Sequence, residues 1–284
     1  MSVDYTNTMG RMTNPYWIDD SDELNEAITE EMGISREVED TVDRVSDNIE
    51  EYIKTVPLSF SSTHMLARKY ATVESIFGNE ININTMIYFF DSMSSYLKLR
   101  RNISYSYKFT NESKTLYITV VAINRNVIVN TLTPKLAHEI RHALQYKKTN
   151  RKYLNNQQYY DATRSLFDKD TVVEAVSDII YLSSRYEQES YAEEMYNELL
   201  FSDRDITSSY KNTNSWMAYE SMKKNIRLIM ENKKQQSIRK EIEKRGYSVD
   251  RFLQIAEKSR RRFLKYLSRA VIMAQKGRFK KEEL

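Results

Sequence analysis

Two histidines and a glutamate lie close together in the segment Thr133–Tyr146, TPKLAHEIRHALQY. His138 and His142 are four residues apart, and positions four apart lie on one face of an α-helix. Both imidazoles can therefore bind the same metal ion. Glu139 lies about 100° further round the helix, beside such an ion, where its carboxylate can accept a proton from water. The spacing predicts metal-dependent hydrolysis.

The same segment has the features of a helix that begins near its first residue. Thr133 is a favourable N-cap, and Pro134 fits the first turn because a missing N–H costs nothing there. Apolar residues follow at helical spacing: Leu136, Ala137, Ile140, Ala143 and Leu144. The alternative to a metal site is a core helix whose two histidines are only hydrogen-bonded.

A catalytic zinc site needs a third protein ligand. The chain has no cysteine, and its third histidine, His64, is more typical of a surface residue than of a remote ligand. A carboxylate is therefore expected. The helical segment 171–181 offers Glu174 and Asp178 on one face, among apolar side chains. A buried carboxylate needs a partner and a metal is a suitable one, whereas the alternative is an ordinary solvated helix face.

HEIRH, followed about thirty residues later by VEAVSD, resembles the gluzincin metallopeptidases, the thermolysin-like group. The resemblance implies Zn²⁺ bound by His138, His142 and Glu174, with Asp178 accepting the N–H of a ligating histidine, His138. It implies a zincin-like core with a small antiparallel sheet and two metal-ligand helices. It further implies hydrolysis of a protein or peptide substrate, with Glu139 as general base.

The chain also resembles the small metallopeptidase domains that cleave phage repressors, which have strands, an H-E-x-x-H helix and a helix beginning near E-A. Both resemblances cover about residues 114–185. The chain departs from the thermolysin-like enzymes because no histidine follows His142 to stabilise the oxyanion. Tyrosine or arginine can take that role, and the candidates are Tyr181, Tyr160 and Arg164.

The composition of the 284 residues limits the class of protein. With 40% hydrophobic and 29% charged residues, the chain can form a core and keep a polar surface. Five Gly and three Pro favour long helices. The absence of cysteine excludes disulfides and thiolate zinc sites. We find no signal peptide and no membrane-spanning run, and expect an intracellular or virion-associated protein of phage or bacterial origin without membrane binding.

Charge divides the chain into three predicted segments: 1–56 as an acidic arm and helix, 57–205 as the metallopeptidase core, and 206–284 as a basic helical region. Residues 1–56 hold 15 Asp/Glu and 4 Lys/Arg, and residues 222–284 hold 20 Lys/Arg and 7 Asp/Glu. Opposite charge at the two ends favours contact within the chain or self-association. The basic end could instead bind nucleic acid or an acidic partner. A non-catalytic zincin-fold virion component or nucleic-acid-associated factor acting through these helices is the alternative to an enzyme.

Hydrophobic periodicity predicts a predominantly helical α+β fold. Apolar spacing predicts a helix at 23–53 that is broken near Gly33, and further helices at 62–77 and 84–99. Alternation of polar and apolar residues then predicts three short antiparallel strands at 103–109, 116–123 and 127–129. In the family that the chain resembles, an edge strand pairs with the substrate backbone, and we expect 116–121 to do so.

Overall fold

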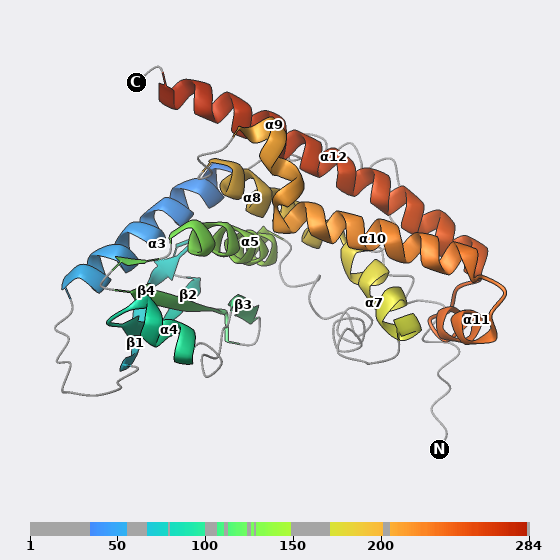
Figure 1. Ribbon diagram of the computed structural model, residues 1–284, viewed down its shortest axis with the longest axis horizontal. Helices are drawn as coiled ribbons and strands as arrows, with labels where there is room; N and C mark the ends of the chain where they lie inside the picture. The colour runs from blue at the N-terminus through green and yellow to red at the C-terminus, as the bar shows by residue number, and fades with distance from the viewer. Residues whose placement is uncertain are drawn as a thin grey trace.

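The computed structural model describes residues 35–55, 67–78, 80–99, 107–110, 113–123, 126–127, 129–148, 171–200 and 205–282. Within these ranges the fold is α+β and mostly helical, as predicted. A small sheet with its covering helices lies at one end of the molecule, and a bundle of longer helices lies at the other (Figure 1).

Helices account for most of the described residues. They are α3 (Arg36–Thr55), α4 (Met93–Leu99), α5 (Val129–Lys148), α7 (Thr171–Ser183), α8 (Arg185–Leu200), α9 (Ile206–Ser209), α10 (Asn214–Glu231), α11 (Gln236–Glu243) and α12 (Val249–Glu282), with one 3-10 turn, η2 (Tyr210–Asn212). None of the helices in the described part of the chain combines the length and the apolar character needed to cross a membrane.

The strands form one mixed sheet. They are β1 (Ala67–Ile76), β2 (Ile81–Phe90), β3 (Tyr107–Thr110), β4 (Thr115–Ile123) and β5 (Asn126–Val127). The order is β1-β2-β4-β3, and β5 pairs with β4. The pairs β3–β4 and β4–β5 are antiparallel as predicted, but β2 and β4 run parallel, so the expectation of a purely antiparallel sheet is wrong.

Two predicted helices are replaced by strands. Residues 67–76 and 81–90 form the antiparallel pair β1–β2, joined through Phe77 and Gly78, which both have positive φ. Along β2, Ile81, Ile83 and Ile87 are buried on one face of the sheet. β-Branched side chains fit this pleated surface. The helical period seen in 84–99 belongs in part to α4, which begins only at Met93.

The strand expected to receive substrate lies inside the sheet. β4 pairs with β2 along its whole length and with β3 and β5 on its other side. Among the described strands β1 lies at one edge of the sheet, and β3 and β5 lie at the other. The prediction that 116–121 is a free edge is therefore wrong, because the sequence did not show that β2 exists.

Two hydrophobic clusters organise the described chain. One joins α3, the inner face of the sheet and α5; the other joins α7, α8, α10, α11 and α12. Helix α8 lies between them, in contact with α5 on one side and α12 on the other (Figure 1). The first cluster joins α3 to the sheet. The division of the chain into three segments, with boundaries after residues 56 and 205, stays a prediction. The metal-site residues lie where α5 meets α8.

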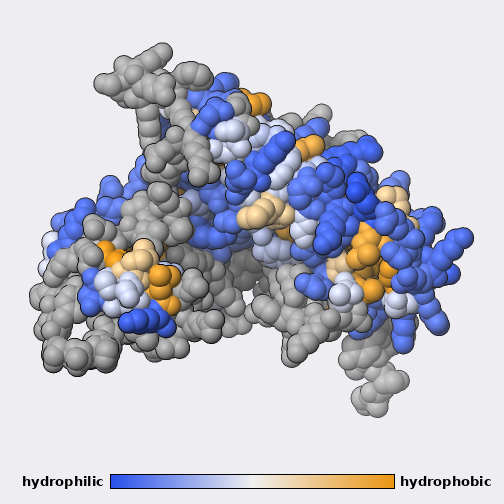
Figure 2. All heavy atoms as spheres, viewed as in Figure 1, coloured by the Kyte–Doolittle hydropathy of each residue, from blue (hydrophilic) through white to orange (hydrophobic). Residues whose placement is uncertain are grey.

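On the face shown in Figure 2, the described residues are mostly hydrophilic and apolar side chains lie in separate small patches. Part of the basic cluster on α12 is used internally. Arg260 pairs with Glu257 and donates to the Tyr219 hydroxyl, whereas Arg262 donates to Gln188 and to the Ser183 carbonyl. These two guanidinium groups therefore brace α12 on its neighbours, and binding of nucleic acid or an acidic partner by 222–284 stays a prediction.

Candidate metal centre

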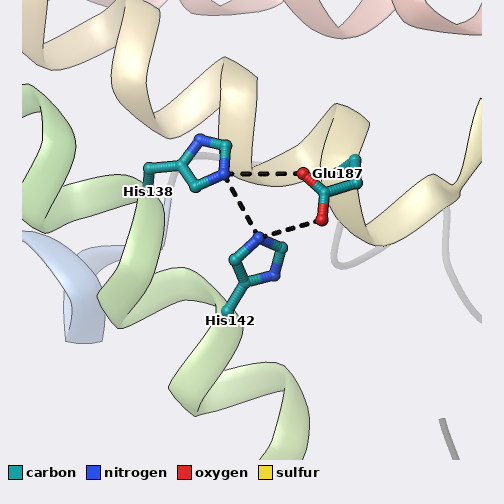
Figure 3. Close-up of side chains that lie close together, drawn as sticks. All are labelled: His138, His142 and Glu187. Atoms are coloured by element: carbon teal, nitrogen blue, oxygen red, sulfur yellow. Dashed lines mark hydrogen bonds and ion pairs between the residues drawn. The ribbon is translucent and has the colours of Figure 1, made fainter. Parts of the chain in front are cut away.

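Helix α5 brings His138 and His142 together on the side that faces α8. Their Nε2 atoms lie 3.2 Å apart. From α8, Glu187 places one carboxylate oxygen 3.5 Å from Nε2 of His138 and the other 3.3 Å from Nε2 of His142 (Figure 3). Two imidazole nitrogens and a carboxylate thus converge on one point, and among the described residues these three form a group able to hold a metal ion.

The outer nitrogens of both histidines face polar side chains: Nδ1 of His138 makes an ion-pair contact, and Nδ1 of His142 has two hydrogen-bonding neighbours. Nδ1 of His138 lies 3.0 Å from a carboxylate oxygen of Glu194. Nδ1 of His142 lies 3.0 Å from the amide oxygen of Gln145 and 3.3 Å from the Ser190 hydroxyl. In the neutral ring, a proton on Nδ1 leaves the Nε2 lone pair facing the centre, so a metal ion bound here must displace the Nε2 proton. Ligating histidines are held in this way in metal proteins, so the residues present fit a metal ion.

The group is almost closed to solvent. Glu187 is 1% exposed and His138 is 7% exposed. Burial opposes charge on His138, but hydrogen bonds and attraction from Glu187 and Glu194 outweigh it and raise the pKa of this imidazole to about 10. Burial opposes ionisation of Glu187 too, yet the two histidines hold its pKa well below the usual value. The site therefore favours a carboxylate beside positive charge.

A further layer of charged groups ties the two helices together. Lys135 on α5 forms an ion pair with Glu194. Arg141 reaches Glu189 at 3.0 Å and Glu193 at 3.5 Å. Gln145, which contacts His142, donates to the same Glu189 oxygen at 2.9 Å. These contacts set the position of α8, and hence of Glu187, against α5.

Tyr191 closes one side of the group. Its ring lies edge-on to His138, with 4.9 Å between centroids and an interplanar angle of 81°. Tyr181 on α7 forms a hydrogen bond with the Tyr191 side chain. Tyr181 is thus linked to His138 through Tyr191. Its role as an oxyanion donor stays a prediction.

The other residues expected from the sequence are placed as follows. Glu139 is half-buried on α5, directly after His138. Pro134 lies inside α5, which begins earlier than expected, at Val129. Tyr160, Arg164 and His64 lie outside the described residues.

Glu174 does not join the histidines. It is exposed in the first turn of α7. Asp178 accepts hydrogen bonds from Ser221 at 2.9 Å and from Asn225 at 2.6 Å, both on α10, rather than from a histidine. Helix α7 packs on α10 and α11, while α8 occupies the place beside α5. The expected pairing of Glu174 and Asp178 with the histidines is corrected to Glu187 and Glu194.

Glu187 could not be identified from the sequence, because the sequence of α8 is typical of a solvent-exposed helix. The segment RYEQESYAEEMYNELL has acidic residues on several faces, yet Glu187, Glu193 and Glu194 are all at most 1% exposed. One signal was available. Glu187, Ser190 and Glu194 are three and seven residues apart, a spacing that places them on one face of a helix.

Comparison of the chain with protein-family models, with curated proteins and with solved structures finds no match. The geometry of the His138–His142–Glu187 group therefore carries the functional argument.

Replacing Glu194 by Gln is expected to weaken zinc binding about 10-fold to 100-fold, the range found for partners of ligating histidines. The amide keeps the size of the side chain but removes the charge that orients His138. Competition with a chromophoric zinc chelator would measure the effect. Glu198→Gln, one turn further along α8, is the matched control, since no ion pair joins Glu198 to a histidine among the described residues. Equal weakening in both variants would contradict the assignment of Glu194.

Proposed function

We propose that the chain is a zinc-dependent metallopeptidase in which His138, His142 and Glu187 hold the ion and Glu139 is the general base. The observation that carries the proposal is the approach of both Glu187 oxygens, within 3.5 Å, to two histidine Nε2 atoms whose Nδ1 atoms each lie 3.0 Å from a side-chain oxygen. Two histidines and one carboxylate are the protein ligands of one class of catalytic zinc site, in which water takes the fourth position.

When bound, zinc lowers the pKa of a water molecule and polarises the carbonyl of a substrate. Glu139 would accept a proton from the attacking water and deliver it to the leaving amine. Glu187 and the histidines would hold the ion, while Glu194, Gln145 and Ser190 would keep the two rings oriented. A purely structural zinc site would have no use for Glu139.

Zinc is favoured over other divalent ions by the type of donor. Imidazole nitrogen suits zinc, whereas magnesium and calcium prefer sites made of oxygen atoms. The preference of the H-E-x-x-H arrangement for amide hydrolysis comes from the carboxylate beside the ion. A protein or peptide is therefore the proposed substrate.

The test is metal content together with cleavage of an unfolded protein such as casein. The chain purified without added metal is expected to hold about one zinc per molecule, measured by elemental mass spectrometry, since the site has three protein ligands. Casein cleavage is expected to stop on chelation and to return with zinc. His142→Ala should lose both properties. A protein that takes up no zinc when zinc is offered, or that cleaves equally well without it, would contradict the proposal.

A further inference from the structure

The side of α12 that faces away from the helix bundle carries almost only positive charge. Helix α12 runs along one long edge of the molecule (Figure 1), and its apolar side packs on α7, α8, α10 and α11. Asp250, an exposed acidic residue in its first turn, pairs with Lys233 at 3.2 Å. Between residues 249 and 277 ten side chains of α12 are exposed, and six of them are basic: Arg251, Lys258, Arg261, Lys265, Arg269 and Lys276.

The six basic residues form a row along the helix, which we call the α12 row. Arg251, Lys258 and Lys265 follow one another at intervals of seven residues, and Arg269 and Lys276 continue with the same interval. Seven residues are close to two full turns, so side chains at this spacing lie nearly in line. At 1.5 Å per residue the row is about 38 Å long. The exposed face of α12 is therefore a straight line of positive charge.

Most of this charge is not balanced by nearby carboxylates. Lys265, Arg269 and Lys276 have no acidic partner among the side chains that the structure describes. Arg261 reaches Glu257 only at 3.9 Å. Like charges four residues apart on a helix repel each other, as Arg261, Lys265 and Arg269 do here. An anion lying along the row would relieve this repulsion.

Helix α3 shows that solvation alone does not require charge of one sign. Its nine exposed residues include five acidic and three basic side chains. Arg36 pairs with Asp40 at 3.9 Å, and Lys54 pairs with Glu50 at 3.3 Å. Mixed signs of this kind keep a surface soluble and allow pairing within the helix. The single sign of the α12 row therefore indicates a partner with many negative charges.

We propose that the α12 row binds double-stranded DNA through the phosphates, without preference for sequence. Duplex DNA carries one negative charge per about 1.7 Å of its axis, and one turn of about 34 Å matches the length of the row. Lysine and arginine contacts to phosphates position a protein on the duplex but do not read bases. An acidic protein surface is a weaker match, because protein surfaces mix both signs of charge.

The absence of an exposed aromatic side chain along the described row favours a duplex over a single strand. Phe252, Phe263 and Tyr266, which lie within this part of α12, are all buried. Proteins that bind single strands stack the bases on aromatic side chains, and these three are not accessible for that purpose. B-DNA is favoured over duplex RNA because its major groove is wide enough to admit an α-helix, whereas that of A-form RNA is narrow.

The α12 row is separate from the metal centre. Helix α8 contacts α5 on one side and α12 on the other, and the row lies on the side of α12 that does not pack on α8. DNA binding here therefore does not depend on the proposed metallopeptidase, and either activity can be lost without the other.

The test is binding of the full-length chain to a fluorescent DNA duplex of about 30 base pairs, roughly three turns. Fluorescence anisotropy would give the Kd at salt concentrations between about 50 and 200 mM. A plot of log K against log salt is expected to have a slope of about −5, since each of the six cations contributes about −0.9. Lys265→Gln combined with Arg269→Gln should reduce the slope by about 2 and weaken binding about 50-fold at about 100 mM salt.

The matched control combines Lys54→Gln with Lys98→Gln. It removes the same charge from exposed lysines on α3 and α4, which pack with the sheet, and it should bind as the unchanged chain does. Circular dichroism would show that both double variants keep their helices. No binding at about 50 mM salt, the low end of the range, or equal weakening in both double variants would contradict the proposal.

Competitors of the same length and charge test the choice of DNA. Unlabelled duplex DNA is expected to displace the probe at a lower concentration than single-stranded DNA, duplex RNA or polyglutamate. If one of the other nucleic acids competes better, the commitment to duplex DNA is wrong. If polyglutamate competes as well as duplex DNA, the row is a site for an acidic protein, and the proposal is overturned.

Discussion

Replacing Glu139 by Gln is expected to leave zinc bound and to lower peptidase activity on the order of 10⁴-fold, the upper range for a general base. The amide has the size of the carboxylate but cannot accept a proton from the attacking water. Glu139 follows His138 directly and is not part of the group that converges on the metal position. Its loss should therefore affect kcat, with little change in zinc affinity.

The measurement is kcat and KM for a fluorogenic peptide obtained from a cleavage site in casein, with zinc content determined on the same samples. Glu174→Gln is the matched control, because it makes the same change at an exposed glutamate on α7. Activity of Glu139→Gln within tenfold of the unchanged protein would exclude Glu139 as the base. A parallel loss in Glu174→Gln would show instead that the carboxylate downstream of H-E-x-x-H takes part, as the sequence suggested.

The local part of the site could be predicted from the sequence. Residues four apart in a helix share a face whatever surrounds them, so His138 and His142 needed only a helix to come together. The structure does bring their Nε2 atoms within 3.2 Å. Their role as metal ligands and the role of Glu139 as a base stay predictions, because the geometry of a helix does not show that a metal ion binds to it.

The third member of the group could not be found in the same way. Whether a glutamate is buried depends on which helices pack together, and that is not a local property. Helix α8 is covered by α5 and α12 on opposite sides, so acidic residues that read as a solvated surface lie in the interior. Glu174 sits among apolar neighbours in sequence but points to solvent in the first turn of α7.

The sheet shows a similar ambiguity. In 84–99 the apolar residues fit a helix, yet Ile83, Ile87 and Phe89 are buried on one face of β2. A short apolar run fits both the helical and the strand period, and the presence of neighbouring strands to pair with decides which structure forms. β2 acquires two such partners, β1 and β4, and the second pairing is parallel. Neither pairing could be read from the segment alone.

Replacing Glu187 by Gln is expected to lower zinc affinity by more than about 100-fold, beyond the range for residues that only orient a ligand. The carboxylate supplies both the negative charge and the oxygen atoms that face His138 and His142 at 3.5 and 3.3 Å. A neutral amide is a much weaker zinc ligand. Chelator competition on folded protein would measure the affinity, with circular dichroism to show that the helices are retained.

The same pair of variants decides between two locations for the third ligand. If Glu187 is the ligand, Glu174→Gln should bind zinc as the unchanged protein does, because its carboxylate lies in solvent away from the group of His138, His142 and Glu187. If Glu174→Gln loses zinc while Glu187→Gln keeps it, the ligand follows the E-x-x-x-D spacing of α7, and α7 must then replace α8 beside α5. If zinc affinity is unchanged in both variants, neither carboxylate is the third ligand, and Glu187 is then a buried carboxylate paired with an imidazolium rather than with a metal.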